Sequence, residues 1–151
     1  MSNCPGNSGL KVEKVMTRNV VSVTEDTPLE EAALILADRP FSSLLVLRDK
    51  KLVGIITQSD LFHVLLDLLG GRRSGVRITA AVANAKGSLA KLTNAIYAAD
   101  GDIVGLGVRE IPESDHLRSE VMLKVQDVAK DKLIEVVRQE AEFIDARETS
   151  V

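Results

Sequence analysis

Gly54-Ile55-Ile56-Thr57-Gln58-Ser59-Asp60 is the stretch that decides the fold of the first half of the chain. Two β-branched residues after a glycine predict the end of a buried strand, and the polar residues after them predict a helix that runs through Leu69. The N-terminus of a helix carries unpaired N–H groups and a partial positive charge, which suit a phosphate. Thr57 is therefore predicted to bond a phosphate oxygen, and Asp60 to accept hydrogen bonds from a ribose diol. The alternative is structural: Thr57 or Ser59 only caps the helix, and Asp60 only complements its dipole.

The composition is that of a globular protein whose core has few aromatic residues. The 151 residues suffice for one medium domain or two small ones, and 45% of them are hydrophobic. Aromatic residues make up only 3%, so the core must consist of Val, Ile, Leu and Ala. No apolar run approaches the ~20 residues of a membrane span, and the N-terminus lacks a signal-peptide pattern. We therefore expect a cytoplasmic protein without a membrane partner.

The charge pattern argues against nucleic-acid binding. The formal net charge is −3, and neither half of the chain has the strong basic excess that contact with a phosphate backbone requires. The pairs Lys50-Lys51 and Arg72-Arg73 are expected to be solvated loop charges. With so few aromatic residues, the chain also offers no platform on which bases would stack. No nucleic acid is expected among its partners.

The elements around the opening stretch predict the order β-α-β-β-α over residues 12–70, after a flexible lead at residues 1–11. Thr27 is predicted to cap a helix that has Pro28 in its first turn. The continuous apolar run Leu44-Leu45-Val46-Leu47 predicts a strand buried on both faces. Gly70 is predicted to end the last helix of this unit.

Four segments carry a family resemblance: Val15-Met16-Thr17-Arg18-Asn19-Val20-Val21-Ser22-Val23, Thr27-Pro28-Leu29-Glu30-Glu31-Ala32, Ser43-Leu44-Leu45-Val46-Leu47 and Leu52-Val53-Gly54-Ile55-Ile56-Thr57. In this order they resemble one repeat of a CBS domain, a module whose pairs bind adenine nucleotides. One landmark departs from the family, because Leu45 stands where many members have a proline. The resemblance implies that this unit binds a nucleotide.

The same resemblance implies a role for each part of the nucleotide site. Thr57 would meet the phosphate and Asp60 the ribose, and two serines ahead of the second strand would reach the phosphates. The base would lie against residues 17–21, where a backbone group of one of two valines reads its edge. The implied nucleotide-binding residues are Thr17, Val20, Val21, Ser42, Ser43, Thr57 and Asp60. Arg18 is the nearest basic residue, and none is clearly placed for a triphosphate, so AMP or ADP fits more easily than ATP.

A break in composition at Gly70-Gly71-Arg72-Arg73-Ser74-Gly75 predicts a linker at residues 71–75 and a second domain at residues 76–151. The elements predicted there are strands at 76–82, 103–111, 120–125 and 142–148, helices at 88–99 and after an Asp127 cap, and a loop at 112–116. The order βαββαβ is that of a ferredoxin-like unit, with helices on one face of an antiparallel sheet and a partly open face that invites a partner. Gly105 and Gly107 are predicted to mark a bulge or close backbone packing in a strand.

This second unit resembles an ACT domain through Val82-Ala83-Asn84-Ala85-Lys86-Gly87-Ser88-Leu89 and Gly101-Asp102-Ile103-Val104. The family's first turn is usually Asp-x-Pro-Gly-x-Leu and often helps to grip a small ligand, commonly an amino acid, between paired domains. Here Asn84 replaces the aspartate and Lys86 the proline, while Gly87 and Leu89 match. Gly87 alternatively only permits a tight turn and a close approach of the helix. The amino-acid-binding residues implied are Asn84, Lys86, Gly87, Ser88, Leu89, Asp102 and Ile103.

The chemistry-bearing residues do not predict an enzyme. His63 is expected to be a helical residue without a catalytic role, and His116 a solvated loop residue. Neither belongs to a pattern of nucleophile, base and orienting group. Cys4 is expected to be an inert thiol. No spacing suggests a zinc site or a glycine-rich phosphate loop, so no catalytic residue, metal or cofactor is expected.

The two resemblances together predict a non-catalytic regulatory protein. A CBS unit followed by an ACT unit is similar to acetoin-utilisation-type CBS–ACT regulatory proteins, which usually carry two CBS repeats. The regulatory ligand would be AMP, ADP or ATP, coupled to the second unit through residues 70–75. Because one repeat leaves an apolar surface uncovered, we expect a homodimer or tetramer through CBS and ACT pairing, which regulates an enzyme or transporter. Two alternatives remain: an amino-acid sensor with a structural CBS half, and a scaffold that binds only protein.

Overall fold

The computed structural model describes residues 11–112 and 117–150. The chain divides into two compact units, Met1–Leu61 and Phe62–Val151, whereas composition placed the boundary at residues 71–75. Almost all of the predicted lead and most of the predicted loop at 112–116, with Cys4 and His116, lie outside the described residues. Within the described part of the chain, no helix combines the length and apolar character needed to cross a membrane.

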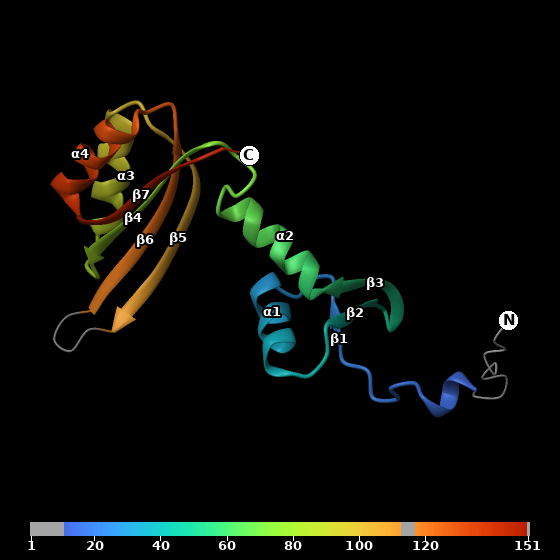
Figure 1. The fold of residues 1–151 in the computed structure, drawn as a ribbon. Coiled ribbons are helices and arrows are strands. Elements are labelled where there is room, and N and C mark those ends of the chain that lie inside the picture. Colours follow the sequence, from blue (N-terminus) through green and yellow to red (C-terminus); the bar gives the residue numbers. More distant parts are fainter. Residues whose placement is uncertain (1–10, 113–116, 151) are drawn as a thin grey trace, which may run out of the picture. The chain divides into compact units, whose positions relative to one another are not determined.

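The first unit has the predicted β-α-β-β-α order (Figure 1). Its elements are the 3₁₀ turn Val12–Lys14, β1 (Ser22–Thr24), α1 (Leu29–Asp38), β2 (Ser43–Arg48), β3 (Lys51–Thr57) and the start of α2 (Gln58–Leu68), which continues past Leu61 into the second unit. The sheet order is β1-β2-β3, with β1 parallel and β3 antiparallel to β2. Ala32, Leu36 and Leu44 form its buried core.

The prediction that Leu44–Leu47 is buried on both faces was wrong. Only Leu44 is fully buried, and the next three residues are half-buried. Leu44 lies in the core beside Ala32 and Leu36 of α1, while alternation along β2 turns Leu45 to the opposite face of the sheet. Leu45 pairs there with Ile55, which is 58% exposed. A continuous apolar strand is normally covered on both faces. In the described part of this unit, no second layer covers the face that carries Leu45 and Ile55.

The predicted cap at Thr27 was also wrong. Pro28 is the N-cap of α1, and its carbonyl accepts the backbone N–H groups of Glu31 and Ala32. The Thr27 hydroxyl oxygen instead accepts the N–H of Thr24 at 3.0 Å. Because this bond points back toward β1, Thr27 stabilises the turn before the helix and not the helix end.

A two-residue turn, Asp49-Lys50, joins β2 to β3. Both residues have positive φ angles, 49° and 63°, the pattern of a type I′ turn. Lys50→Gly is expected to raise the free energy of unfolding by about 1 kcal/mol, because glycine adopts this conformation without strain. The control Lys51→Gly, one residue later in β3, is expected to lower it by about 0.5–1 kcal/mol. Urea unfolding checks both variants, and a less stable Lys50→Gly protein would refute the strain assigned to Lys50.

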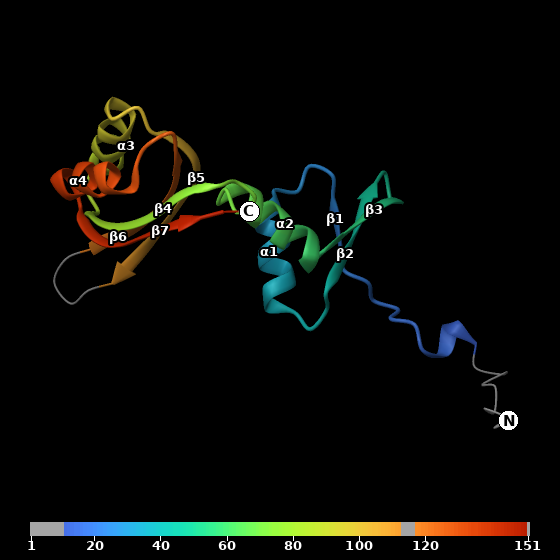
Figure 2. The same ribbon diagram turned by 45° about the horizontal axis from the view of Figure 1, so that its top comes forward.

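The second unit has the predicted ferredoxin-like βαββαβ order. Its elements are β4 (Gly75–Ala83), α3 (Ser88–Ala98), β5 (Asp102–Pro112), β6 (Leu117–Gln126), α4 (Lys130–Glu140) and β7 (Glu142–Thr149). The four strands are antiparallel in the order β5-β6-β4-β7, and both helices cover one face of the sheet (Figures 1 and 2). The core is aliphatic, as predicted: Val76, Ile78, Ala80, Val82, Leu92, Ile96, Val121, Leu123, Val125, Leu133 and Val137.

One prediction about this unit needs correction. Asp127 does not cap α4: it has a φ of 61° in the turn before the helix, and Ala129 is the N-cap. The face of the sheet opposite the helices is partly open, as predicted, since Leu69 and Gly70 pack against Gly105 of β5. The bulge and the close backbone packing predicted for Gly105 and Gly107 are confirmed at Gly105, where the β5–β6 register shifts and the backbone of Leu69 approaches, whereas Gly107 faces only side chains.

Candidate functional site

Thr57 and Asp60 bond each other at the junction of β3 and α2. One Asp60 oxygen, Oδ2, accepts the Thr57 N–H at 2.8 Å and the Thr57 hydroxyl at 2.7 Å. In return, the Thr57 hydroxyl oxygen accepts the Asp60 N–H at 3.3 Å. This reciprocal arrangement is a capping box with aspartate in the place of glutamate. The structural role weighed for these residues is thus present, and it fixes both side chains at the exposed start of the helix.

Both predicted serines lie beside this box. Ser43 pairs directly with Thr57 across β2 and β3, so the two side chains share one face of the sheet. The carbonyl of Ser42 accepts the N–H of Gln58, the first residue of α2, at 3.0 Å. The sheet therefore gathers Ser42, Ser43, Thr57 and Asp60 at one end of β2.

The predicted base-binding valines approach the same end of the sheet. Because β1 runs parallel to β2 with Ser22 opposite Leu45, the residues just before Ser22 lie level with Ser43. The carbonyl of Val21 accepts the N–H of Leu45 at 3.5 Å, and Val20 is 54% exposed. Thr17 is exposed and precedes β1 by several residues, so the strand pairing does not position it.

Sequence reasoning missed one positioning residue, Gln58. Its side-chain amide donates to the carbonyl of Leu36 at 3.4 Å, in addition to the backbone bond to Ser42. These two bonds tie the first turn of α2 to α1 and to the start of β2. The only sequence signal for this role is its place between Thr57 and Asp60.

Two arginines of this unit, Arg48 and Arg18, are engaged away from the box. Arg48 and Glu25 form an ion pair, and the hydrogen bond from Arg48 holds the pKa of Glu25 below its usual value. Arg48 belongs to the hairpin end of β2, at the opposite end of the strand from Ser43. The Arg18 guanidinium donates to the carbonyl of Glu13 at 3.4 Å. These contacts direct neither arginine to Thr57.

The predicted amino-acid site is divided in the structure. The Asn84 amide donates to Glu110 at 3.2 Å, near the end of β5, whereas Asp102 begins β5 opposite Gln126. The length of α3 separates the Asn84–Leu89 segment from Asp102 and Ile103, so one chain does not bring them together. An aspartate at position 84 would repel Glu110 instead of donating to it.

Gly87 permits the turn before α3 and is not needed for a close approach of the helix. Its φ is 89°, in the left-handed region that favours glycine. A Cβ atom added at Gly87 would meet nothing within 4 Å. The alternative of a tight turn is thus confirmed, and the close approach of the helix was wrong. Lys86 beside it is exposed, while Ser88 and Leu89 are half-buried.

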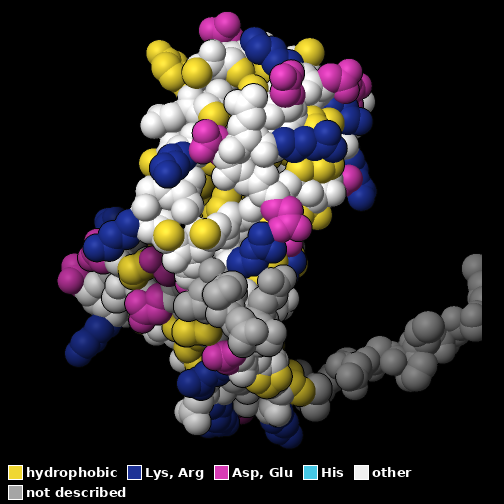
Figure 3. All heavy atoms as spheres, turned by 90° about the vertical axis from the view of Figure 1, so that its left-hand side faces the viewer, with side chains coloured by type: hydrophobic (Ala, Val, Ile, Leu, Met, Phe, Trp, Pro, Cys, Tyr) yellow, Lys and Arg dark blue, Asp and Glu magenta, His cyan; other side chains and the backbone are white. Residues whose placement is uncertain are grey.

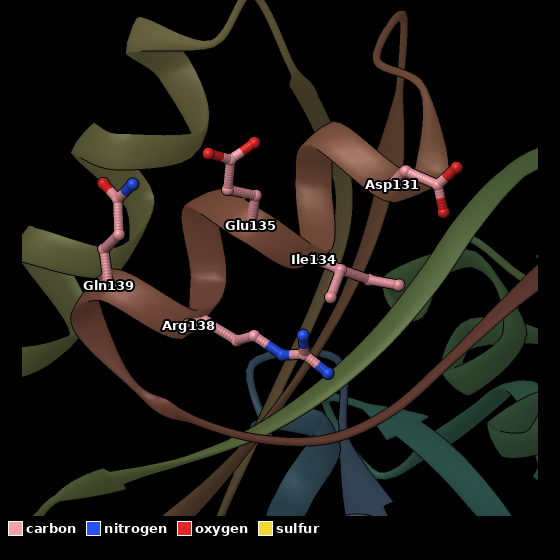
Figure 4. A pocket seen from close by; sticks show the side chains of 5 residues that line it. All are labelled: Asp131, Ile134, Glu135, Arg138 and Gln139. Atoms are coloured by element: carbon pink, nitrogen blue, oxygen red, sulfur yellow. The ribbon is translucent and has the colours of Figure 1, made fainter.

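A hollow of about 610 Å³ follows α4 and contains none of the predicted ligand residues. Figure 4 shows its lining residues on successive turns of the helix: Asp131, Ile134, Glu135, Arg138 and Gln139. The Arg138 guanidinium stacks on the Phe143 ring, 5.0 Å from its centroid. On the face seen in Figure 3, basic and acidic side chains are interspersed, without a patch of one sign.

Comparison with known proteins identifies the first unit. Residues 12–67 match the CBS domain family, so the chain contains a single CBS domain. No ACT family match supports the second unit, for which the ferredoxin-like fold is what is shown.

Three curated proteins share short regions with the chain. Inosine-5'-monophosphate dehydrogenase of Thermoplasma acidophilum is 41% identical over 52 residues, which are 34% of this chain and 11% of that protein. Homoserine O-acetyltransferase of Methanohalobium evestigatum is 33% identical over 55 residues, 36% of this chain and 11% of that protein. An uncharacterized 17.7 kDa protein of Acidianus ambivalens is 41% identical over 58 residues, 38% of this chain and 35% of that protein. The chain thus matches only a minor part of each relative.

Proposed function

We propose that this protein is a non-catalytic regulator whose CBS domain binds an adenine nucleotide. The observation that carries the proposal is the capping box of Thr57 and Asp60, held beside Ser42 and Ser43 at one end of the sheet. The match of residues 12–67 to the CBS domain family supports a regulatory ligand-binding module at this place.

The capping box suits an exchange of hydrogen bonds with a nucleotide. The Thr57 hydroxyl now donates its single proton to Asp60. On binding, this proton would turn to a phosphate oxygen, and a ribose hydroxyl would donate to Asp60 in its place, because a carboxylate only accepts. Each of the two side chains keeps its number of hydrogen bonds in this exchange, and both already lie in position. Such preorganisation lowers the cost of binding.

The surroundings favour a small phosphate charge and an apolar contact for the base. Val20 offers exposed aliphatic surface, and its backbone is the better candidate for reading the base edge, because the Val21 carbonyl already accepts the Leu45 N–H. Arg48 and Arg18 are engaged elsewhere. We therefore propose AMP or ADP in preference to ATP.

Calorimetric titration of AMP, ADP, ATP and S-adenosylmethionine tests the proposal. Asp60→Ala is expected to weaken AMP binding at least tenfold, about 1.4 kcal/mol, because the ribose diol loses its charged acceptor. Asp67→Ala, which removes an exposed carboxylate from the other end of the same helix, is the control and should leave the affinity unchanged. The proposal that this site binds a nucleotide would be refuted if wild type and Asp60→Ala bound equally, with millimolar or weaker affinity. Thermal stabilisation by an amino acid alone would favour the second unit as the sensor.

We further propose that two copies of the chain complete the CBS module. The face of the β1-β2-β3 sheet away from Ala32 and Leu36 carries Leu45 and the exposed Ile55, and alternation places Ser43 and Thr57 on this same face. We name this surface, Ser43, Leu45, Ile55 and Thr57, the uncovered face. A second copy packed on it would bury the apolar residues and enclose the nucleotide. Pairing of the second units would extend such a dimer to a tetramer.

A further inference from the structure

The turn after α2 packs against the sheet of the second unit. Gly70 has a φ of 63°, and the bonds from Gly71 N–H to the Leu66 carbonyl (2.7 Å) and from Gly70 N–H to the Asp67 carbonyl (3.1 Å) make a Schellman motif. Gly70 is itself buried. The segment that composition predicts as a flexible tether therefore begins with a hydrogen-bonded, buried turn.

This turn lies on the face of the four-stranded sheet opposite α3 and α4, where two glycines of β5 make room for it. A Cβ atom added at Gly105 would lie 2.4 Å from the Leu69 carbonyl carbon and 2.7 Å from the Gly70 nitrogen. At Gly107 it would meet only the ends of two side chains, those of Leu69 at 3.1 Å and Met122 at 3.5 Å. Gly105 is thus required for backbone-to-backbone contact, whereas Gly107 contacts groups that can move. We call the contact of Leu69 and Gly70 with Gly105 the glycine seat.

The helix α2 connects the glycine seat to the candidate nucleotide site. Its first residues, through Leu61, belong to the first unit, and the rest belong to the second. Thr57 and Asp60 cap its N-terminus, and the glycine seat holds its C-terminal turn. Because α2 is one continuous helix from Gln58 to Leu68, no loop interrupts the chain between its capped first turn and its last turn.

We propose that α2 and the glycine seat transmit nucleotide binding to the four-stranded sheet, in place of a flexible 71–75 linker. This inference rests on the proposed function for the identity of the ligand. Binding exchanges the bond between the Thr57 and Asp60 side chains for bonds to the ligand, which then hold the first turn of α2, and the turn at the glycine seat carries the effect to β5. Because coupling between two sites is reciprocal, loosening the seat must also loosen the capped first turn.

Hydrogen-exchange mass spectrometry of the full chain tests the inference, with Gly105→Ala as the variant and Gly107→Ala as its control on the same face of the same strand. In wild type and Gly107→Ala, saturating AMP is expected to slow exchange about fivefold at residues 57–60, 69–71 and 102–112. In Gly105→Ala, AMP should slow exchange at residues 57–60 alone. Should Gly105→Ala fold poorly, Leu69→Ala replaces it. This variant shortens the Leu69 side chain without moving the backbone against Gly105, and it is expected to lose part of the AMP protection at residues 69–71 and 102–112.

The outcomes separate the two proposals. Protection by AMP at residues 57–60 alone in wild type would overturn the coupling and leave nucleotide binding intact. If AMP changes exchange nowhere, nucleotide binding is refuted. The coupling is then tested by comparing exchange among the ligand-free variants. Exchange at residues 57–60 that is about fivefold faster in Gly105→Ala or Leu69→Ala than in Gly107→Ala supports the coupling, and equal exchange overturns it.

Discussion

Ile55→Asp is expected to convert a dimer of this protein into monomers, with dimerisation weakened at least about 100-fold. Ile55 is 58% exposed in β3, on the uncovered face. In a two-fold dimer the substitution places two carboxylates in one apolar interface, where neither finds a cation or water. Sedimentation velocity at micromolar concentrations measures the change. The same variant should bind AMP more weakly, since Thr57 and Ser43 share the face that the second copy encloses.

Leu34→Asp is the matched control for this experiment. Leu34 is an equally exposed aliphatic residue (62%) of the same unit, but it lies on the solvent side of α1. It receives the same charge and should leave the dimer intact. A wild-type protein that sediments as a monomer at micromolar concentration would contradict the dimer outright. Dissociation by both variants alike would show that general loss of folding, and not the uncovered face, causes the effect.

Periodicity was sufficient to predict the order of elements in both units. Alternation in residues 76–82 identified β4, and the spacing of Leu92 and Ile96 identified α3, because in each case one face is fully buried. Gly70 was correctly predicted to end α2, since a Schellman motif requires a left-handed residue at that position. Such local rules depend on neighbouring residues alone.

Features that depend on tertiary contacts were not predictable in this way. The apolar run at Leu44–Leu47 has the composition of a doubly buried strand, but whether a second layer exists depends on what packs on it. The glycine at position 105 indicated close packing, but the sequence did not indicate its partner, Leu69, which lies 36 residues away in the chain. At the candidate site, the sequence named both Thr57 and Asp60 but not their mutual bonds, because a cap and a ligand site use the same residue types.

Leu123→Ala is expected to lower the free energy of unfolding of the second unit by about 3 kcal/mol. Leu123 is fully buried in β6, at the centre of a core with few aromatic residues to fill a void. Its neighbour in register, Leu106 of β5, points to the same face but remains 40% exposed at the edge of the sheet. Leu106→Ala is therefore the control, with an expected loss of about 1 kcal/mol, because water refills the space that the side chain leaves.

Urea unfolding followed by circular dichroism compares the two variants with wild type. Since the first unit forms its own compact core around Leu36 and Leu44, the loss in Leu123→Ala should fall on the transition of the second unit. Leu36→Ala should shift the other transition instead. Equal losses in Leu123→Ala and Leu106→Ala would refute the placement of Leu123 at the centre of the core and of Leu106 at its exposed edge. A single transition, shifted equally by Leu36→Ala and Leu123→Ala, would instead show that α2 and its glycine seat make the two units unfold as one.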